Sequence, residues 1–181
     1  MSALSHLDNT ASNLVLSSSE KDSIQTSIRT LKIRLKDYFG SEIKEQIQFG
    51  SSTRGTIIPP KVDERADVDY MVVFDNPNSY QQNTFIEKLK RFAEAKYNRS
   101  EIHRSHPTVV LKLNHISFEL VPAVNSWLSG LQIPAPSNSY ASWISTDPTG
   151  FNNDLIDTNN SNNFTIKPLI RLMKYWNVYN G

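Results

Sequence analysis

Two aspartates two positions apart interrupt an apolar run in the middle of the chain. Asp67 and Asp69 lie in Ala66-Asp67-Val68-Asp69-Tyr70-Met71-Val72-Val73-Phe74, whose β-branched and bulky residues predict a buried strand. Residues i and i+2 of a strand point to the same face, so the two carboxylates project together. Like charges held side by side disfavour each other's ionisation unless a cation lies between them, and hard oxygen ligands suit Mg²⁺ or Mn²⁺. The pair therefore predicts a divalent metal site.

A second motif, Gly50-Ser51, directly follows a predicted strand over residues 45–49 and opens a short polar stretch that could begin a helix. A glycine lets the backbone approach a ligand closely, and the following N–H groups with the Ser51 hydroxyl can hold phosphate oxygens. Arg54, in the same turn, either adds a phosphate contact or is a solvated loop residue. A phosphate cradle beside a carboxylate pair indicates phosphoryl or nucleotidyl transfer.

A third acid, Glu119, stands in the apolar segment Ile116-Ser117-Phe118-Glu119-Leu120-Val121-Pro122-Ala123. The order Gly50-Ser51, Asp67-Val68-Asp69, Glu119 resembles the polymerase-β-type nucleotidyltransferase superfamily. Residues 143–148 and 167–176 are similar to segments of its oligoadenylate-synthase-like branch. Within that branch the chain most resembles the bacterial cGAS/DncV-like nucleotidyltransferases (CD-NTases, SMODS proteins). The likeness runs from about Phe49 to Trp176.

The resemblance implies a set of site residues. Asp67, Asp69 and Glu119 would be catalytic and would bind two Mg²⁺ ions, with Mn²⁺ as a possible substitute. Gly50, Ser51, Arg54, Arg171 and Lys174 would bind the nucleotide, since the family's Arg-x-x-Lys segment contacts the triphosphate. Relatives mostly carry aspartate where this chain has Glu119, which reaches one methylene further. The alternative for Glu119 is an edge-strand residue facing solvent, and for Arg171 and Lys174 two exposed cations of an amphipathic helix.

The resemblance also implies a function. The enzyme would join nucleoside triphosphates into a cyclic or short linear oligonucleotide second messenger, with pyrophosphate release, in bacterial anti-phage defence. A regulatory partner is possible. Two alternatives stay open: a minimal, toxin-like nucleotidyltransferase that modifies a protein or an RNA end, and a catalytically silent nucleotide-binding module.

Composition narrows the class of protein. A net charge of +1 over 181 residues argues against a long nucleic-acid track. The absence of cysteine excludes disulfides, thiolate catalysis and Cys-type zinc sites. The sequence holds no apolar run of the ~20 residues that a membrane span needs, and its polar, Ser-rich start does not resemble a secretion signal. We therefore expect a cytoplasmic protein without membrane segments.

The periodicity predicts an α+β domain, a mixed sheet with helices packed on one face. Helices are expected over residues 20–39, with Ser18 or Ser19 as N-cap, and over 81–97 and 165–179. Strands are expected over 45–49, 66–74, 100–104, 108–113 and 116–121, the last two joined by a turn at Asn114-His115. Residues 57–65 read as an exposed loop, residues 75–78 as a turn, and 125–163 as a flexible loop or a lid over the nucleotide.

The chain is expected to consist of three parts. Residues 1–19 are expected to be a flexible leader and 20–163 the nucleotidyltransferase catalytic core. The resemblance implies that residues 164–181 begin a spine helix toward a C-terminal helical lobe, and the apolar residues on more than one side of this helix indicate that the lobe is largely missing.

Overall fold

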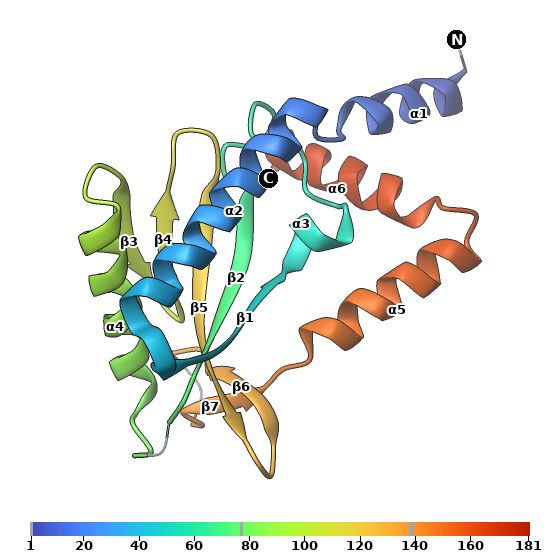
Figure 1. Ribbon diagram of the computed structural model, residues 1–181. Helices are drawn as coiled ribbons and strands as arrows, with labels where there is room; N and C mark the ends of the chain where they lie inside the picture. The colour runs from blue at the N-terminus through green and yellow to red at the C-terminus, as the bar shows by residue number, and fades with distance from the viewer. Residues whose placement is uncertain (1, 77, 138–139) are drawn as a thin grey trace.

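A mixed β-sheet forms the centre of the molecule (Figure 1). The computed structural model describes residues 2–76, 78–137 and 140–181. Within these residues the strand order is β1-β2-β5-β4-β3, and β6 and β7 continue the sheet from β5. The strands are β1 Ile43–Phe49, β2 Asp67–Phe74, β3 Glu101–Ser105, β4 Thr108–Lys112, β5 Ser117–Ser126, β6 Gly130–Pro134 and β7 Trp143–Ser145. Strands β2 and β5 are parallel, and the other described pairs are antiparallel. The predicted α+β class is confirmed.

Two helices, α2 (Ser18–Phe39) and α4 (Gln82–Lys96), cover one face of this sheet and build the main core. Both carry apolar residues at helical spacing, which gives each a single stripe to bury. Ser17 caps α2 in a capping box with Glu20, one residue earlier than expected. The core side chains from these two helices are Ile24, Ile28, Leu31, Leu35, Phe39, Phe85, Ile86, Leu89, Phe92 and Ala93.

The alternation of β2 divides its side chains between two environments. Val68, Tyr70, Val72 and Phe74 pack into the helix-covered core. The intervening positions point to the opposite face, where Met71 and Val73 join Ala123 in a small second cluster. Asp67 and Asp69 lie on that second face, which α2 and α4 leave open.

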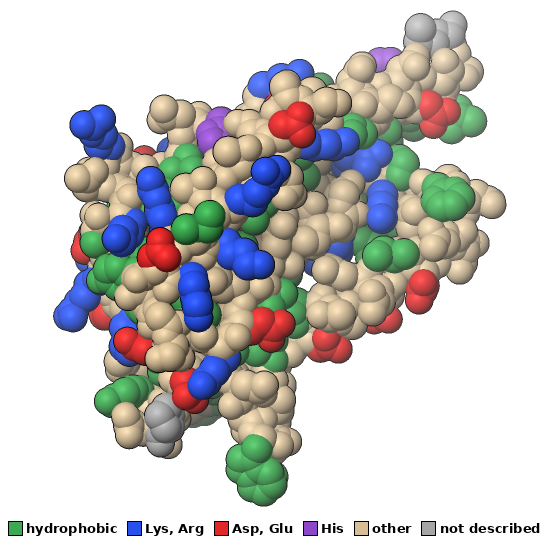
Figure 2. Space-filling view, in the orientation of Figure 1, with side chains coloured by type: hydrophobic (Ala, Val, Ile, Leu, Met, Phe, Trp, Pro, Cys, Tyr) green, Lys and Arg blue, Asp and Glu red, His purple; other side chains and the backbone are tan. Residues whose placement is uncertain are grey.

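Further helices lie beyond β1, on the side of the molecule away from α4 (Figure 1). They are α1 (Ala3–Asn13), α5 (Pro148–Ser161) and α6 (Ile166–Asn180), and the short helix α3 (Gly50–Arg54) lies between them and the sheet. Helix α1 contacts α6, whereas α5 contacts α3 and β1. Figure 2 shows the surface hollowed between the body of the sheet and the outer helices α5 and α6.

Within the expected leader over residues 1–19, residues 3–13 form α1 and Ser18 begins α2. Ser2 caps α1 by accepting a hydrogen bond from the Ser5 N–H, and Ala11 and Leu14 are buried. Leu7, Ala11 and Leu14 are spaced as one helical face, a signal that the Ser-rich composition obscured. Met1 lies outside the described residues.

The segment 125–163 is mostly regular where it is described, so the prediction of a loop is wrong there; residues 138 and 139 lie outside the described residues. The segment holds the end of β5, strands β6 and β7, and helix α5. Asp147 caps α5 by accepting a hydrogen bond from the Gly150 N–H at 2.8 Å, and Pro148 opens the helix. The asparagine-rich helix lacks a continuous apolar stripe, so the hydrophobic periodicity did not predict it. Asp147 and Pro148 are the sequence signals that could have indicated its start.

The remaining loop predictions have mixed outcomes. The turn at Asn114-His115 is confirmed, with the Leu113 N–H donating to the Ile116 carbonyl at 3.0 Å. The expected exposure of residues 57–65 is wrong at its start, because Ile57 and Ile58 are buried. In the predicted turn at 75–78, residue 77 lies outside the described residues.

Leu31 provides a direct test of the helix-covered core. The Leu31→Ala variant is expected to lose about 2–5 kcal/mol of unfolding free energy, because Leu31 is fully buried. Ile33 on the same helix is 61% exposed, so Ile33→Ala should change stability by less than about 0.5 kcal/mol. Urea denaturation followed by circular dichroism measures both, and equal losses would contradict the described packing.

Candidate active site

The parallel pairing of β2 and β5 brings three carboxylates together on the open face of the sheet. Asp69 is directly opposite Glu119, and Asp67 is opposite Ser117. Carboxylate oxygens of Asp67, Asp69 and Glu119 all lie within 4.8 Å of one another, and the three residues are partly buried. Strand β5 lies between β2 and β4, so Glu119 does not stand on an edge strand. The solvent-facing alternative for Glu119 therefore does not describe this chain.

Burial and mutual repulsion disfavour the charged forms of these acids. Burial, then the charges of Asp69 and Glu119, raise the pKa of Asp67 to about 7. Burial raises the pKa of Asp69, against the opposing effects of Arg54 and of a hydrogen bond from the Ser51 backbone. Burial and Asp69 likewise raise the pKa of Glu119. A nearby cation would lower the free energy of ionising all three carboxyl groups.

The donor set fits a hard divalent cation. Carboxylate oxygens are the ligands that Mg²⁺ and Mn²⁺ prefer, and a cluster that resists full ionisation by itself favours a bound positive charge. Asp67, Asp69 and Glu119 are thus the residues that would hold the metal.

Gly50 begins α3 directly against Asp69. Its φ of +74° is strained for an L residue, and a Cβ there would lie 1.6 Å from the Asp69 Oδ2. The next residue, Ser51, is buried, and its backbone N–H donates a hydrogen bond to the Asp69 carboxylate. The predicted approach of the Gly50-Ser51 turn to the carboxylates is present in the structure.

Arg54, at the end of α3, also faces the site. Its positive charge lowers the pKa of Asp69 and of Lys174, which places it near both. Its guanidinium carbon lies 4.8 Å from the centre of the Phe151 ring, and its Nη1 donates to the Asn152 Oδ1 at 3.4 Å. Two α5 residues therefore contact the arginine that the sequence indicated.

Helix α6 supplies the two remaining predicted cations, in different environments. Burial lowers the pKa of Lys174, whereas the charges of Asp67 and Asp69 raise it, so its ammonium group lies near both aspartates. Arg171 donates from Nη1 to the Gly55 carbonyl at 2.9 Å, just after α3. Among the described residues its buried Nε has no hydrogen-bond partner, and burial lowers its pKa. Arg171 thus supports α3, whereas Lys174 is closer to the carboxylates.

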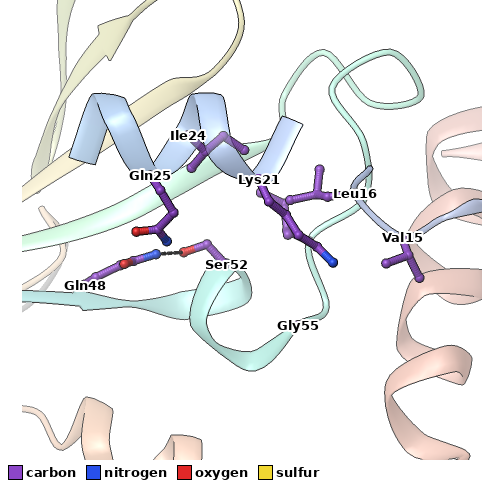
Figure 3. A pocket seen from close by; sticks show the side chains of 9 residues that line it. Val15, Leu16, Lys21, Ile24, Gln25, Gln48, Ser52 and Gly55 are labelled. Carbon is purple, nitrogen blue, oxygen red and sulfur yellow. Dashed lines mark hydrogen bonds between the residues drawn. The ribbon is translucent and has the colours of Figure 1, made fainter. Parts of the chain in front are cut away.

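A cavity of about 350 Å³ lies behind α3 (Figure 3). Its walls come from the α1–α2 connection, the start of α2, the end of β1 and α3, and the Gln48 Nε2 donates to the Ser52 Oγ within it at 3.1 Å. The residues that line it are Val15, Leu16, Lys21, Ile24, Gln25, Gln48, Ser52, Gly55 and Ile57. None of the three carboxylates is among them, so this cavity is separate from the candidate active site.

Sequence reasoning missed three residues near the site. Phe151 and Asn152 lie in the segment expected to be a loop or a lid, and His103 is not among the expected site residues. His103 of β3 is in register with Val110, which is in register with Glu119, and its charge lowers the Glu119 pKa. The strand pattern could have placed His103 on this face, but only with the pairing of β3, β4 and β5 in hand.

Residues 1–159 match the family described as Second Messenger Oligonucleotide or Dinucleotide Synthetase domain (SMODS). The chain belongs to this family. The predicted relationship to cGAS/DncV-like nucleotidyltransferases is thereby confirmed. In the described part of this SMODS chain, every helix is too short or too polar to span a lipid bilayer.

Known proteins similar to this SMODS chain are longer than it. A probable cyclic nucleotide synthase of Bacillus cereus (strain VD146) is 28% identical over 180 residues, covering 79% of this chain and 52% of that relative. Vibrio cholerae DncV cyclic AMP-GMP synthase, in complex with nonhydrolyzable GTP, aligns with a TM-score of 0.77 and 12% identity over 92% of this chain and 63% of its own. CdnC of E. coli MS115-1, in a CdnC:HORMA-deltaN complex, aligns with a TM-score of 0.67 and 16% identity. The alignment covers 90% of this chain and 52% of CdnC. The chain spans about half the length of the curated relative that it matches.

Gly50 and Gly55 offer a matched pair of substitutions. Both have positive φ, so alanine at either position introduces backbone strain of about 1 kcal/mol, but only Gly50→Ala meets the Asp69 carboxylate. We expect Gly50→Ala to weaken Mg²⁺ binding at least about tenfold, since a Cβ must displace Asp69, and Gly55→Ala to leave it nearly unchanged. Isothermal titration with Mg²⁺ measures this; equal effects would contradict the close approach.

The raised Asp67 pKa predicts a pH-dependent stability. Because the folded-state pKa of about 7 exceeds the ordinary value of 3.8, the folded protein binds more protons, and the metal-free protein loses stability as pH rises from about 4 to 7. Asp67→Asn should flatten this loss, raise the Tm in EDTA at pH 8 by on the order of 2–4 °C, and abolish the Tm increase caused by Mg²⁺. Asp154→Asn, on the exposed side of α5, is the control and should behave as wild type. A wild-type Tm independent of pH over this range would contradict the described environment.

Proposed function

We propose that this chain is the catalytic part of a synthase that joins nucleoside triphosphates into a cyclic or short linear oligonucleotide second messenger and releases pyrophosphate. The observation that carries the proposal is the convergence of Asp67, Asp69 and Glu119 beside the Gly50-Ser51 turn in a SMODS chain. Within the chain, residues 20–163 would form the catalytic core, and residues 164–181 would begin the helix that leads to a helical lobe.

The reaction breaks a phosphoanhydride bond of the donor and forms a phosphate ester bond to the acceptor. The oxygen of an acceptor ribose hydroxyl attacks the α-phosphorus of the donor triphosphate, the bond from that phosphorus to the bridging oxygen breaks, and pyrophosphate leaves with the electron pair. Asp67, Asp69 and Glu119 would hold two Mg²⁺ or Mn²⁺ ions, which supply charge stabilisation and lower the pKa of the attacking hydroxyl. All three protein ligands are ionised when the cations are bound.

The two sides of the carboxylate cluster would bind different substrates. Toward β1, Ser51, Arg54 and Lys174 offer a hydroxyl and two positive charges, which suits the donor's phosphate chain. Glu119 lies on the other side, on β5, where it would orient the acceptor hydroxyl and accept its proton. Arg171 would act by holding the end of α3 through the Gly55 carbonyl.

The relatives support the proposed product class and a protein partner. The Vibrio relative is a cyclic AMP-GMP synthase, and the E. coli relative is described in a complex with HORMA, so a regulatory protein partner is part of the proposal. We further propose a cytoplasmic location, where nucleoside triphosphates are found, and a role in anti-phage signalling.

Product analysis tests the proposed function. The chain is incubated with all four radiolabelled nucleoside triphosphates and Mg²⁺ or Mn²⁺, and products are treated with phosphatase and nuclease before chromatography and mass spectrometry. A phosphatase-resistant cyclic product, or a short linear oligonucleotide, supports the proposal. Label found only on added protein or tRNA would replace it with the toxin-like alternative. A longer natural form, where one exists, should be assayed beside this chain.

Glu119 is expected to serve chemistry more than nucleotide binding. Glu119→Gln removes a metal ligand and the proton acceptor, so synthesis should fall by about 100-fold or more while binding of a nucleoside triphosphate analogue is largely retained. Glu45→Gln is a matched control, because Glu45 is an exposed glutamate on β1, which β2 separates from β5. Initial rates and equilibrium titration measure the two effects; near-normal synthesis by Glu119→Gln would remove Glu119 from the mechanism.

A further inference from the structure

Arg54 has a defined set of contacts with α5. Its guanidinium carbon lies 4.8 Å from the centre of the Phe151 ring, within the range of a cation–π interaction. The neighbouring Asn152 accepts from the Arg54 Nη1 at 3.4 Å. An arginine side chain loses considerable rotamer freedom when it is held in one place, so contacts that order it before the ligand arrives favour binding.

Asn152 connects this arginine to the start of α3. Its Nδ2 donates to the Thr53 Oγ1 at 3.2 Å, and the Thr53 hydroxyl donates to the Gly50 carbonyl at 2.9 Å. Both ends of the Asn152 amide are therefore used, one by Arg54 and one by Thr53. The hydrogen bonds link α5 to the glycine that lies against Asp69.

Helix α5 has a capped start, and its C-terminal part is bonded to α6. Asp147 caps its N-terminal end through the Gly150 N–H. Near its C-terminal end the buried Asn159 accepts from the Lys167 N–H of α6 at 3.0 Å. The contacts with Arg54 thus come from an element anchored to the rest of the fold.

We propose that Phe151 and Asn152 are positioning residues that hold the Arg54 guanidinium toward the triphosphate side of the carboxylate cluster. The inference rests on the proposed function, because it assigns the bound phosphate chain to this side of the site. Phe151 restricts the guanidinium by stacking on it, and Asn152 fixes one of its nitrogens, leaving the other donors for phosphate oxygens. Phe151 is 61% exposed, so its role in the core is small.

The test measures binding of Mg²⁺-tripolyphosphate, a phosphate chain without a base, by isothermal titration to the 181-residue chain. Phe151→Leu should weaken binding about two- to fivefold, and Phe151→Trp, which keeps an aromatic face, should restore it. Asn152→Ala should also weaken binding, whereas Asn153→Ala, the exposed neighbour of the same type, should not. Thermal unfolding should show near wild-type Tm values for all four variants.

A double-mutant cycle separates positioning from a general effect on structure. In an Arg54→Ala background, Phe151→Leu should cause no further loss of binding, because its effect passes through the arginine. Additive losses, a Phe151→Leu variant that binds as wild type, or a wild-type chain that binds no tripolyphosphate would each overturn the inference. Failure to make an oligonucleotide from nucleoside triphosphates is a separate result: it would count against the proposed function while leaving a measured coupling between Phe151 and Arg54 intact.

Discussion

Three partly buried carboxylates, with oxygens within 4.8 Å of one another, are the constraint on which the rest of the site depends. Each acid raises the free energy of ionising its neighbours, and the surrounding apolar strands reduce the compensation that water provides. Such a cluster is retained at a cost to the stability of the metal-free fold. This cost is consistent with a site that is preorganised to bind cations together with a negatively charged triphosphate.

The fold separates the part that supplies stability from the part that supplies chemistry. Helices α2 and α4 bury one face of the sheet in a continuous apolar core, whereas the other face holds the small cluster of Met71, Val73 and Ala123. On that other face α3 is fixed by contacts from several directions: Gly50 against Asp69, Arg171 at the Gly55 carbonyl, and α5 through Asn152. A helix of five residues has little stability alone, so its position depends on these neighbours.

The sequence predicted the elements whose pattern is local. The apolar alternation around Asp67 and Asp69, the stripes of α2 and α4, and the glycine before Ser51 each carry a physical signal within a few residues, and the mixed sheet followed from them. The contribution of α5 could not be predicted in this way, because its asparagines form no apolar face and its contacts with Arg54 join residues almost 100 positions apart. Helix α1 was missed for a similar reason: its one buried face is short, and its partner α6 is at the other end of the chain.

The parallel pairing of β2 with β5 has a consequence for when the site can exist. Between Asp69 and Glu119 the chain must complete α4, β3 and β4 before β5 can dock, and a parallel pair cannot form through a simple hairpin. Closing a loop of this length costs chain entropy before the strand pairing can compensate for it. A nascent or partly unfolded chain therefore carries its acids apart, and the ability to capture cations arises together with the completed sheet.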